Sequence, residues 1–309
     1  MRKIIMVLLL FAFASAAYAS TQAADEAFHS QQDGPKPNMA FTDKTKDEVL
    51  QKLIADYAGK FTVETFSDEV TGLSIQYNLY LPEGYTAGKK YPLVVFIGDA
   101  SCAGKSPEFS LKQGYGGLSW FDRDAAVIVP VYPGVILDDH KGYILTDYVE
   151  LTGRFIRWAK EHYGISEVYG TGQSMGCMTS LVLASKYPDL YTACLFVSGQ
   201  WDVNTLAGLA GQKFIYAASM GDPVASKGQH EVIELFRSID ANFVLYSGID
   251  AGNPDIGIRN EQRANFVTFR KGTTLPEGSA DGASEHMTSF DFAYKIKALR
   301  DWLFAQKED

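Results

Sequence analysis

Residues 167–187 read EVYGTGQSMGCMTSLVLASKY, and this stretch decides the fold. A short apolar run at 167–171 precedes a serine that lies between two glycines, and an apolar segment of helical length follows at 176–187. The pattern predicts a buried strand that turns abruptly into a helix. Glycines two positions before and after Ser174 permit such a turn, because side chains there would meet neighbouring backbone. The turn exposes the Ser174 hydroxyl at the amino end of a helix, where partial positive charge stabilises an anion.

On both sides of this turn, short runs of β-branched and aromatic residues alternate with longer amphipathic segments. We expect strands over residues 61–66, 73–81, 92–98, 125–132, 167–171, 193–197, 214–218, 243–247 and 265–269. We expect helices from residue 42 or 43 to 57, and over 147–163, 176–187, 230–239 and 290–306. Apolar strands separated by helices are typical of a mostly parallel central sheet with helices on both faces. The first two runs predict an antiparallel hairpin at the N-terminal edge of this α/β fold.

The composition describes a folded, acidic chain. Its 309 residues are 46% hydrophobic, which suffices for a large core and excludes a disordered protein. The chain has 28 Lys and Arg residues against 37 Asp and Glu, a net charge of −9. It therefore lacks the basic surface that is typical of a nucleic-acid-binding protein. No polybasic segment suits an anionic membrane surface. The sequence holds no HExxH, GxGxxG or Walker motif, so we expect no metal and no cofactor.

The first nineteen residues have the parts of a secretory signal peptide. Arg2 and Lys3 precede an apolar run, and Ala17 and Ala19 form the expected cleavage site before Ser20. The run is shorter than the roughly 20 apolar residues that span a bilayer. We therefore expect export, to the periplasm or the medium, and no membrane attachment after cleavage. The predicted divisions are a signal peptide at 1–19, a flexible lead-in with a helix at 20–60, and a catalytic domain at 61–309.

Beyond the serine turn, further stretches resemble the α/β-hydrolase superfamily, in particular exported bacterial esterases of the prolyl-oligopeptidase and polyhydroxybutyrate-depolymerase-like type. They are YNLYLPEGY, KKYPLVVFI, VYGTGQSMGCMTSLVLASKYPDLY, FIYAASMGDPV and DWLFAQ, spread over most of residues 76–306. The resemblance implies an α/β-hydrolase fold and an acyl-enzyme formed on a nucleophilic serine. It also implies a small-molecule or polymeric ester as substrate; the oligomeric state stays open.

In this superfamily the acid and then the histidine follow the serine along the chain. His286 is the one histidine that lies after the last long strand and before the final helix, so we expect it to act as the base for Ser174. Asp222, directly after the seventh expected strand, is similar to the superfamily's acid turn, although the spacing here is tighter. Asp250 and Asp255, one strand later, remain rivals for the acid.

Acyl transfer also needs N–H donors aimed at the developing oxyanion. The resemblance implies that the Met175 amide is one donor. The second is expected in the loop GDASC at 98–102, where the superfamily commonly has H-G-x-G, and between Asp99 and Ala100 we favour Ala100. Three aromatic residues are candidates for lining a substrate pocket, with core packing as the alternative for each: Trp201, Trp120 and Tyr132.

Three cysteines in an exported chain permit one disulfide. Cys102 lies on the expected oxyanion loop and Cys177 lies three residues after the serine, so the fold brings both towards one spot. We predict a Cys102–Cys177 disulfide, with two reduced thiols as the alternative. Cys194, in the middle of a strand, is interpreted as core packing.

Two other functions remain open at this point. A serine peptidase of the prolyl-oligopeptidase type has the same architecture, and a catalytically inactive binding protein can keep the fold. An ester is favoured because the chain has no room for a propeller-like gate. Ester alcohols also leave more readily than amines, so an altered oxyanion loop impairs peptide cleavage more.

Overall fold

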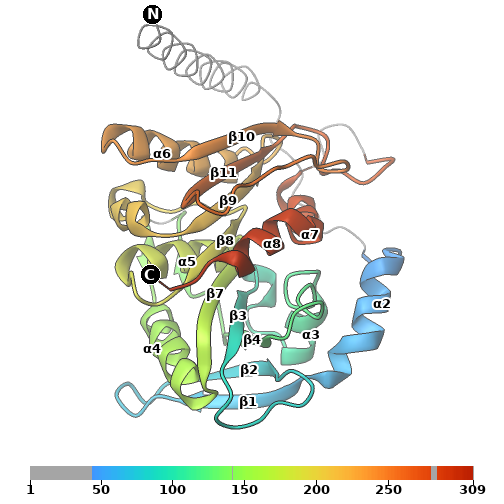
Figure 1. Cartoon of the computed structure of the whole chain (residues 1–309), viewed down its shortest axis with the longest axis vertical. Coiled ribbons are helices and arrows are strands. Elements are labelled where there is room, and N and C mark those ends of the chain that lie inside the picture. Colours follow the sequence, from blue (N-terminus) through green and yellow to red (C-terminus); the bar gives the residue numbers. More distant parts are fainter. Residues whose placement is uncertain (1–43, 141, 280–283, 309) are drawn as a thin grey trace, which may run out of the picture.

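The computed structural model describes residues 44–140, 142–279 and 284–308, and its centre is one large sheet (Figure 1). The nine strands of this sheet in the described residues are β1 (Thr62–Ser67), β2 (Ser74–Tyr80), β3 (Tyr91–Ile97), β4 (Ala126–Val131), β7 (Ile165–Gln173), β8 (Ala193–Val197), β9 (Phe214–Ser219), β10 (Val244–Ile249) and β11 (Ala264–Phe269). Their order is β1-β2-β4-β3-β7-β8-β9-β11-β10. A separate short hairpin joins β5 (Leu137–Asp138) to β6 (Ile144–Leu145).

The pairing of the strands confirms the predicted fold class. β1 and β2 form the antiparallel hairpin at one edge, and β2 runs antiparallel to β4. The remaining neighbours, from β4 through β3 to β10, pair in parallel. Each expected strand is present with ends that differ by a few residues. Because the carboxyl ends of the parallel strands meet at one edge of the sheet, the loops that follow β3, β7, β8 and β9 lie close together.

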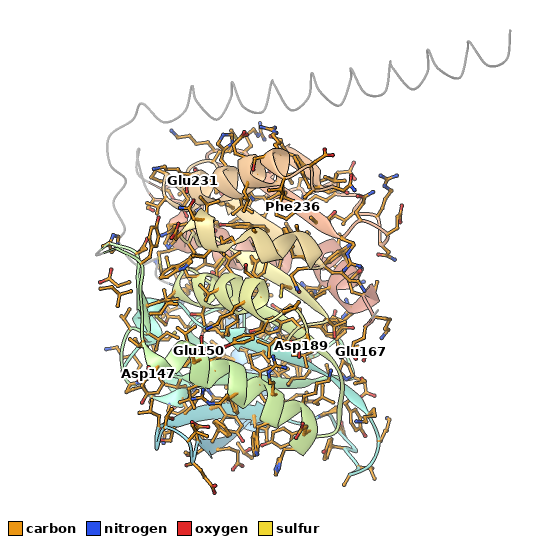
Figure 2. The ribbon with its side chains drawn as sticks, turned by 90° about the vertical axis from the view of Figure 1, so that its left-hand side faces the viewer. Asp147, Glu150, Glu167, Asp189, Glu231 and Phe236 are labelled. Atoms are coloured by element: carbon orange, nitrogen blue, oxygen red, sulfur yellow. The ribbon has the colours of Figure 1, made fainter. Side chains whose placement is uncertain are left out.

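Helices cover both faces of the sheet, as predicted. One face carries α4 (Asp147–His162), α5 (Met175–Lys186) and α6 (Ala225–Ser238), and Figure 2 looks onto this face, with Glu150 on α4 and Phe236 on α6 among its labels. The other face carries α2 (Glu48–Tyr57), α3 (Pro107–Lys112), α7 (His286–Lys295) and α8 (Lys297–Ala305). Each face has its own apolar core, with Phe155, Leu181 and Phe236 in the first and Leu50, Phe290 and Leu299 in the second.

Three helix boundaries differ from the predictions, each for a local reason. α2 begins at Glu48, because the Asp47 side chain accepts the Leu50 N–H and caps the helix there. α6 begins at Ala225 rather than 230. The segment 290–306 is divided into α7 and α8, because Ile296 has an extended backbone conformation. α3 was not predicted.

The predicted signal peptide at 1–19 and the lead-in as far as residue 43 lie outside the described residues. Within the part of the chain that the structure describes, no helix combines the length and the apolar character needed to cross a membrane.

Candidate active site

The serine turn has the strained geometry that its sequence predicts. Ser174 lies between β7 and α5 with φ 49°, a left-handed conformation that residues other than glycine rarely adopt. A Cβ on Gly172 would overlap the backbone of Gly176, and a Cβ on Gly176 would overlap the carbonyl oxygen of Ile97. Both glycines are therefore required for the close packing of the turn against β3. Strain of this kind persists where the surrounding structure holds it, often at functional sites.

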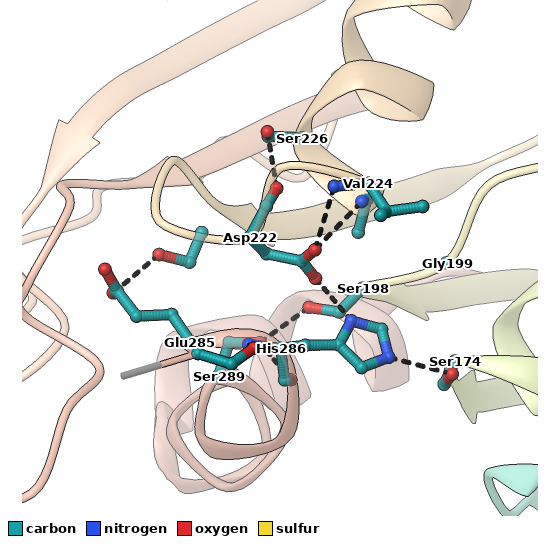
Figure 3. A network of polar contacts seen from close by, with 12 residues as sticks. Ser174, Ser198, Gly199, Asp222, Val224, Ser226, Glu285, His286 and Ser289 are labelled. Atoms are coloured by element: carbon teal, nitrogen blue, oxygen red, sulfur yellow. Dashed lines mark hydrogen bonds and ion pairs between the residues drawn. The ribbon is translucent and has the colours of Figure 1, made fainter. Parts of the chain in front are cut away.

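Three residues from separate segments of the chain meet at this turn (Figure 3). His286 Nε2 lies 2.9 Å from Ser174 Oγ, and His286 Nδ1 lies 2.5 Å from Asp222 Oδ2. His286 and Asp222 are both buried. The structure thus brings together the serine, the histidine and the first-choice acid of the sequence analysis. Asp250, one of the two rivals, pairs instead with Arg270 at the surface.

The charge on His286 is controlled by its carboxylate neighbours. Burial is the largest single influence and lowers the pKa of the imidazolium, while the Asp222 carboxylate raises it by Coulomb attraction and a hydrogen bond. Asp99 and Asp139 add weaker attraction, so the pKa of His286 is raised above its ordinary value of 6.5. An imidazole in this setting takes up a proton more readily than one in water.

The acid has its position fixed by the start of α6. Asp222 Oδ1 accepts the N–H groups of Val224 and Ala225, both at 3.1 Å. This leaves Oδ2 for the histidine, so each carboxylate oxygen has a separate set of donors (Figure 3). The amino end of a helix also favours a negative charge, which explains why the helix starts earlier than its apolar periodicity predicted.

A buried carboxylate next to the histidine holds that segment in place, and sequence reasoning missed it. Glu285 is 2% exposed and accepts from Ser219 Oγ at 2.8 Å, from Thr274 Oγ1 at 2.6 Å and from the Gly272 N–H at 2.7 Å. A Cβ on Gly221 would overlap its carboxylate. Glu285 therefore joins the end of β9, the loop after β11 and the first turn of α7.

Two serines hold the histidine from the other side and were also missed. Ser289 Oγ donates to the His286 carbonyl at 2.9 Å and lies 2.7 Å from Ser198 Oγ, at the end of β8 (Figure 3). Ser289 lies three positions after His286 but 91 positions after Ser198, so no short sequence motif marks the network.

The two expected oxyanion donors lie at the start of helical segments. Met175 is the first residue of α5 and Ala100 is the first residue of a 3₁₀ turn, Ala100–Cys102, and the first N–H groups of a helix have no acceptor within it. The Asp99 side chain is engaged elsewhere: it accepts the Ser101 N–H at 2.8 Å and Gln173 Nε2 at 2.7 Å. The hydrogen bond between Gln173 and Asp99 connects the loop after β3 to the residue before the serine.

Of the three aromatic candidates, the structure keeps one. Trp120 is fully buried, donates to the Gly116 carbonyl and packs in the core of the α7 and α8 face, so its assignment to a substrate pocket was wrong. Tyr132 is also buried, with its hydroxyl 2.9 Å from Thr152 Oγ1, and that assignment was wrong too. Trp201 is buried as well, at 4% exposed, in the core of the α4 to α6 face. It remains a candidate by its position, two residues after Gly199, where a Cβ would crowd the Ser174 carbonyl oxygen.

The predicted Cys102–Cys177 disulfide is wrong. All three cysteines of the chain lie within the described residues, and all are free, buried thiols. Cys177 Sγ packs beside Gly199, after β8, whereas Cys102 Sγ packs beside Gly98, after β3, so the two sulfur atoms have different neighbours. Burial raises the pKa of Cys102 to about 12, which makes its thiol unreactive. Among the described residues no group of three His, Cys, Asp or Glu side chains is arranged to hold a metal ion.

Comparison with known proteins places the chain in a family. Residues 68–302 match the family model described as "Putative esterase". No curated protein matches the chain. A crystal structure of a thermostable esterase superposes with a TM-score of 0.66 at 21% identity, over 81% of this chain and 64% of that one, so the chain spans less than two thirds of that protein.

Two further structures show the same fold at low sequence identity. A ferulic acid esterase gives a TM-score of 0.53 at 12% identity, over 80% of this chain and 98% of that one. A mutant of the feruloyl esterase module from Clostridium thermocellum, complexed with sinapinate, gives a TM-score of 0.52 at 14% identity, over 81% of this chain and 89% of that one. Because the family match spans most of the chain, the protein belongs to this family of esterases, and it has the α/β-hydrolase fold.

Proposed function

We propose that the protein is an exported serine esterase in which Ser174, His286 and Asp222 form the catalytic triad. The observation that carries the proposal is the unbroken chain of contacts from Ser174 Oγ through the imidazole to the Asp222 carboxylate. A serine hydroxyl is a weak nucleophile until an adjacent base accepts its proton, and a base held by a carboxylate is the usual solution.

In the first half of the reaction Ser174 Oγ attacks the ester carbonyl carbon while His286 Nε2 takes the hydroxyl proton. The tetrahedral oxyanion then accepts from the N–H groups of Met175 and Ala100. The bond from carbon to the alcohol oxygen breaks as Nε2 returns the proton to the leaving alcohol. Water repeats the sequence on the acyl-enzyme and releases the acid. Asp222 keeps the imidazole proton on Nδ1 throughout, so that Nε2 is free to accept.

The substrate we propose is an ester with an aromatic or polymer-derived part, such as a feruloyl ester or a polyester. Tyr143 supports it, because its ring is half-exposed and makes an edge contact at 5.2 Å with the buried ring of Trp201, which follows the segment beside the serine. Flat apolar side chains of this kind suit an aromatic ring. The feruloyl esterase structures that share the fold support the same substrate class.

Hydrolysis of p-nitrophenyl acetate tests the proposal, with Ser174→Ala and His286→Ala as the variants. Loss of a triad member costs up to about a million-fold in a well-studied serine hydrolase, so both variants should fall by several orders of magnitude. The matched control is His140→Ala, since the His140 ring is exposed and lies outside the triad. Near-normal activity in His286→Ala, or a loss in His140→Ala, contradicts the triad.

A substrate panel separates esterase from peptidase. We expect kcat/KM to be higher for methyl ferulate and related aryl esters than for aminoacyl-p-nitroanilides; the opposite ranking favours a peptidase. Export is part of the proposal and rests on residues 1–19 alone. Fractionation of cells that express the full chain, with mass measurement of the mature N-terminus, tests it: a chain retained in the cytoplasm with residues 1–19 attached refutes export.

A further inference from the structure

A groove with a cavity volume of about 680 Å³ lies against the loop after β3 and the first turn of α7, and the proposed mechanism does not use it. Ala100, the expected oxyanion donor, and Met287, the residue after the triad histidine, both line it. Its outer wall carries three lysines, Lys44, Lys105 and Lys112, and none of its lining residues is acidic. A group attached to an ester held at Ser174 therefore has space to enter this groove.

Three lysines line this groove in a chain whose net charge is −9, and the carboxylates that pair with two of them lie outside the lining. Lys44 is paired with Asp291 at 2.9 Å and Lys112 with Glu108 at 2.7 Å. Lys105 makes no ion pair within the described residues, and its ammonium lies over the Phe109 ring, 5.9 Å from the centroid. Lys105 therefore has donors available for a ligand.

The other side of the site has the opposite charge. Asp139 accepts a hydrogen bond from Gln200, near the half-exposed ring of Tyr143, and Asp202 and Glu231 lie close enough to act on the same ring. A negative group on a substrate is repelled from that side and attracted to the lysines. Coulomb interactions of this kind orient a charged ligand in a cleft.

We propose that the lysine groove binds a carboxylate carried by the ester substrate, so that the enzyme prefers anionic esters to neutral ones. This inference rests on the proposed function, because it places the groove next to a working triad. The apolar parts of Phe109 and Met287 contact the spacer between the ester and the carboxylate, and Lys105 binds the charge, with Lys112 lining the same groove.

Two matched pairs of substrates test the proposal on either side of the scissile bond. On the acyl side, mono-p-nitrophenyl glutarate is compared with its methyl ester; on the alcohol side, 4-carboxyphenyl acetate is compared with its methyl ester. We expect kcat/KM to be about two- to fivefold higher for the anionic member of one pair, chiefly through a lower KM, since partly exposed ion pairs are individually weak. Raising the ionic strength should reduce this ratio.

The ratio of kcat/KM between the anionic and the neutral substrate should fall towards one in Lys105→Gln. It should fall further in the double variant Lys105→Gln/Lys112→Gln. Lys297→Gln is the matched control, because Lys297 is an exposed lysine on α8 outside the groove, and it should leave the ratio unchanged. A ratio near one in the parent enzyme for both pairs, or a ratio that Lys105→Gln does not change, overturns the proposal. The Ser174→Ala variant separates the two failures: if it abolishes hydrolysis while no anionic preference exists, the triad stands and the groove proposal falls.

Discussion

Replacing Asp222 with asparagine exchanges one oxygen for an NH₂ group, and it should leave the proton of His286 on the wrong nitrogen. Asp222 Oδ1 accepts the N–H groups of Val224 and Ala225, while Oδ2 faces His286 Nδ1. Backbone N–H groups cannot accept, so the asparagine oxygen must stay at the first position and its NH₂ must face Nδ1. Nδ1 then becomes the acceptor, and the proton moves to Nε2, the atom that has to accept from Ser174.

The magnitude follows from the two orientations open to the asparagine. The reversed orientation leaves both backbone N–H groups without an acceptor, at about 1–3 kcal/mol each, so the wrong tautomer persists. In a serine protease of a different fold, the same exchange with intact geometry lowered kcat by about 10⁴-fold. We expect a similar loss here, about 5.4 kcal/mol in transition-state free energy at 1.36 kcal/mol per tenfold.

Steady-state hydrolysis of p-nitrophenyl acetate by Asp222→Asn measures this loss, with the melting temperature checking that the fold persists. The matched control is Asp250→Asn, which removes a carboxylate that is paired with Arg270 at the surface, and it should stay within a few-fold of the parent. A loss of less than about tenfold in Asp222→Asn, with normal melting, refutes the tautomer argument. An equal loss in Asp250→Asn reassigns the acid.

Four further outcomes are expected. Because His286 must be neutral to act as base and its pKa is raised above 6.5, kcat/KM should rise with pH through a pKa above that value. Asp99→Asn removes a negative charge near His286, so the acidic limb of the plot of kcat/KM against pH should move to lower pH. An unchanged limb contradicts the attraction between Asp99 and His286. Reductant should leave the melting temperature unchanged and the unfolded protein should titrate three thiols, whereas a lower melting temperature in reductant indicates a disulfide. Gly176→Ala should lose activity and melt earlier, because its Cβ overlaps the Ile97 carbonyl oxygen; an active, stable variant shows that the turn relaxes.

The strands and the serine turn could be predicted because their signals are local. Apolar runs between helix-length segments indicate a parallel sheet, and the two glycines around Ser174 follow from backbone sterics within five residues. His286 was predicted from chain order alone, and the structure places it as the first residue of α7 rather than in a loop.

The interactions that hold the site together could not be predicted, because their partners are remote in sequence. Glu285 accepts from Ser219, 66 positions earlier, and nothing in the tripeptide SEH distinguishes it from a solvated glutamate. Trp120 and Tyr132 were misplaced because an aromatic residue near a strand end carries no sign of which way its side chain points. The disulfide was wrong for the same reason: proximity of two Cα positions does not decide where two thiols point.

The span of the triad along the chain has a consequence for folding. Ser174 and His286 are 112 positions apart, and His286 and Asp222 are 64 apart, so their hydrogen bonds form only after long loops have closed. Contacts of such separation are entropically expensive to reach and tend to form late. We therefore expect refolding to restore the circular dichroism of the sheet and its helices before it restores esterase activity, and the interval between the two signals reports the docking of α7 onto the finished sheet.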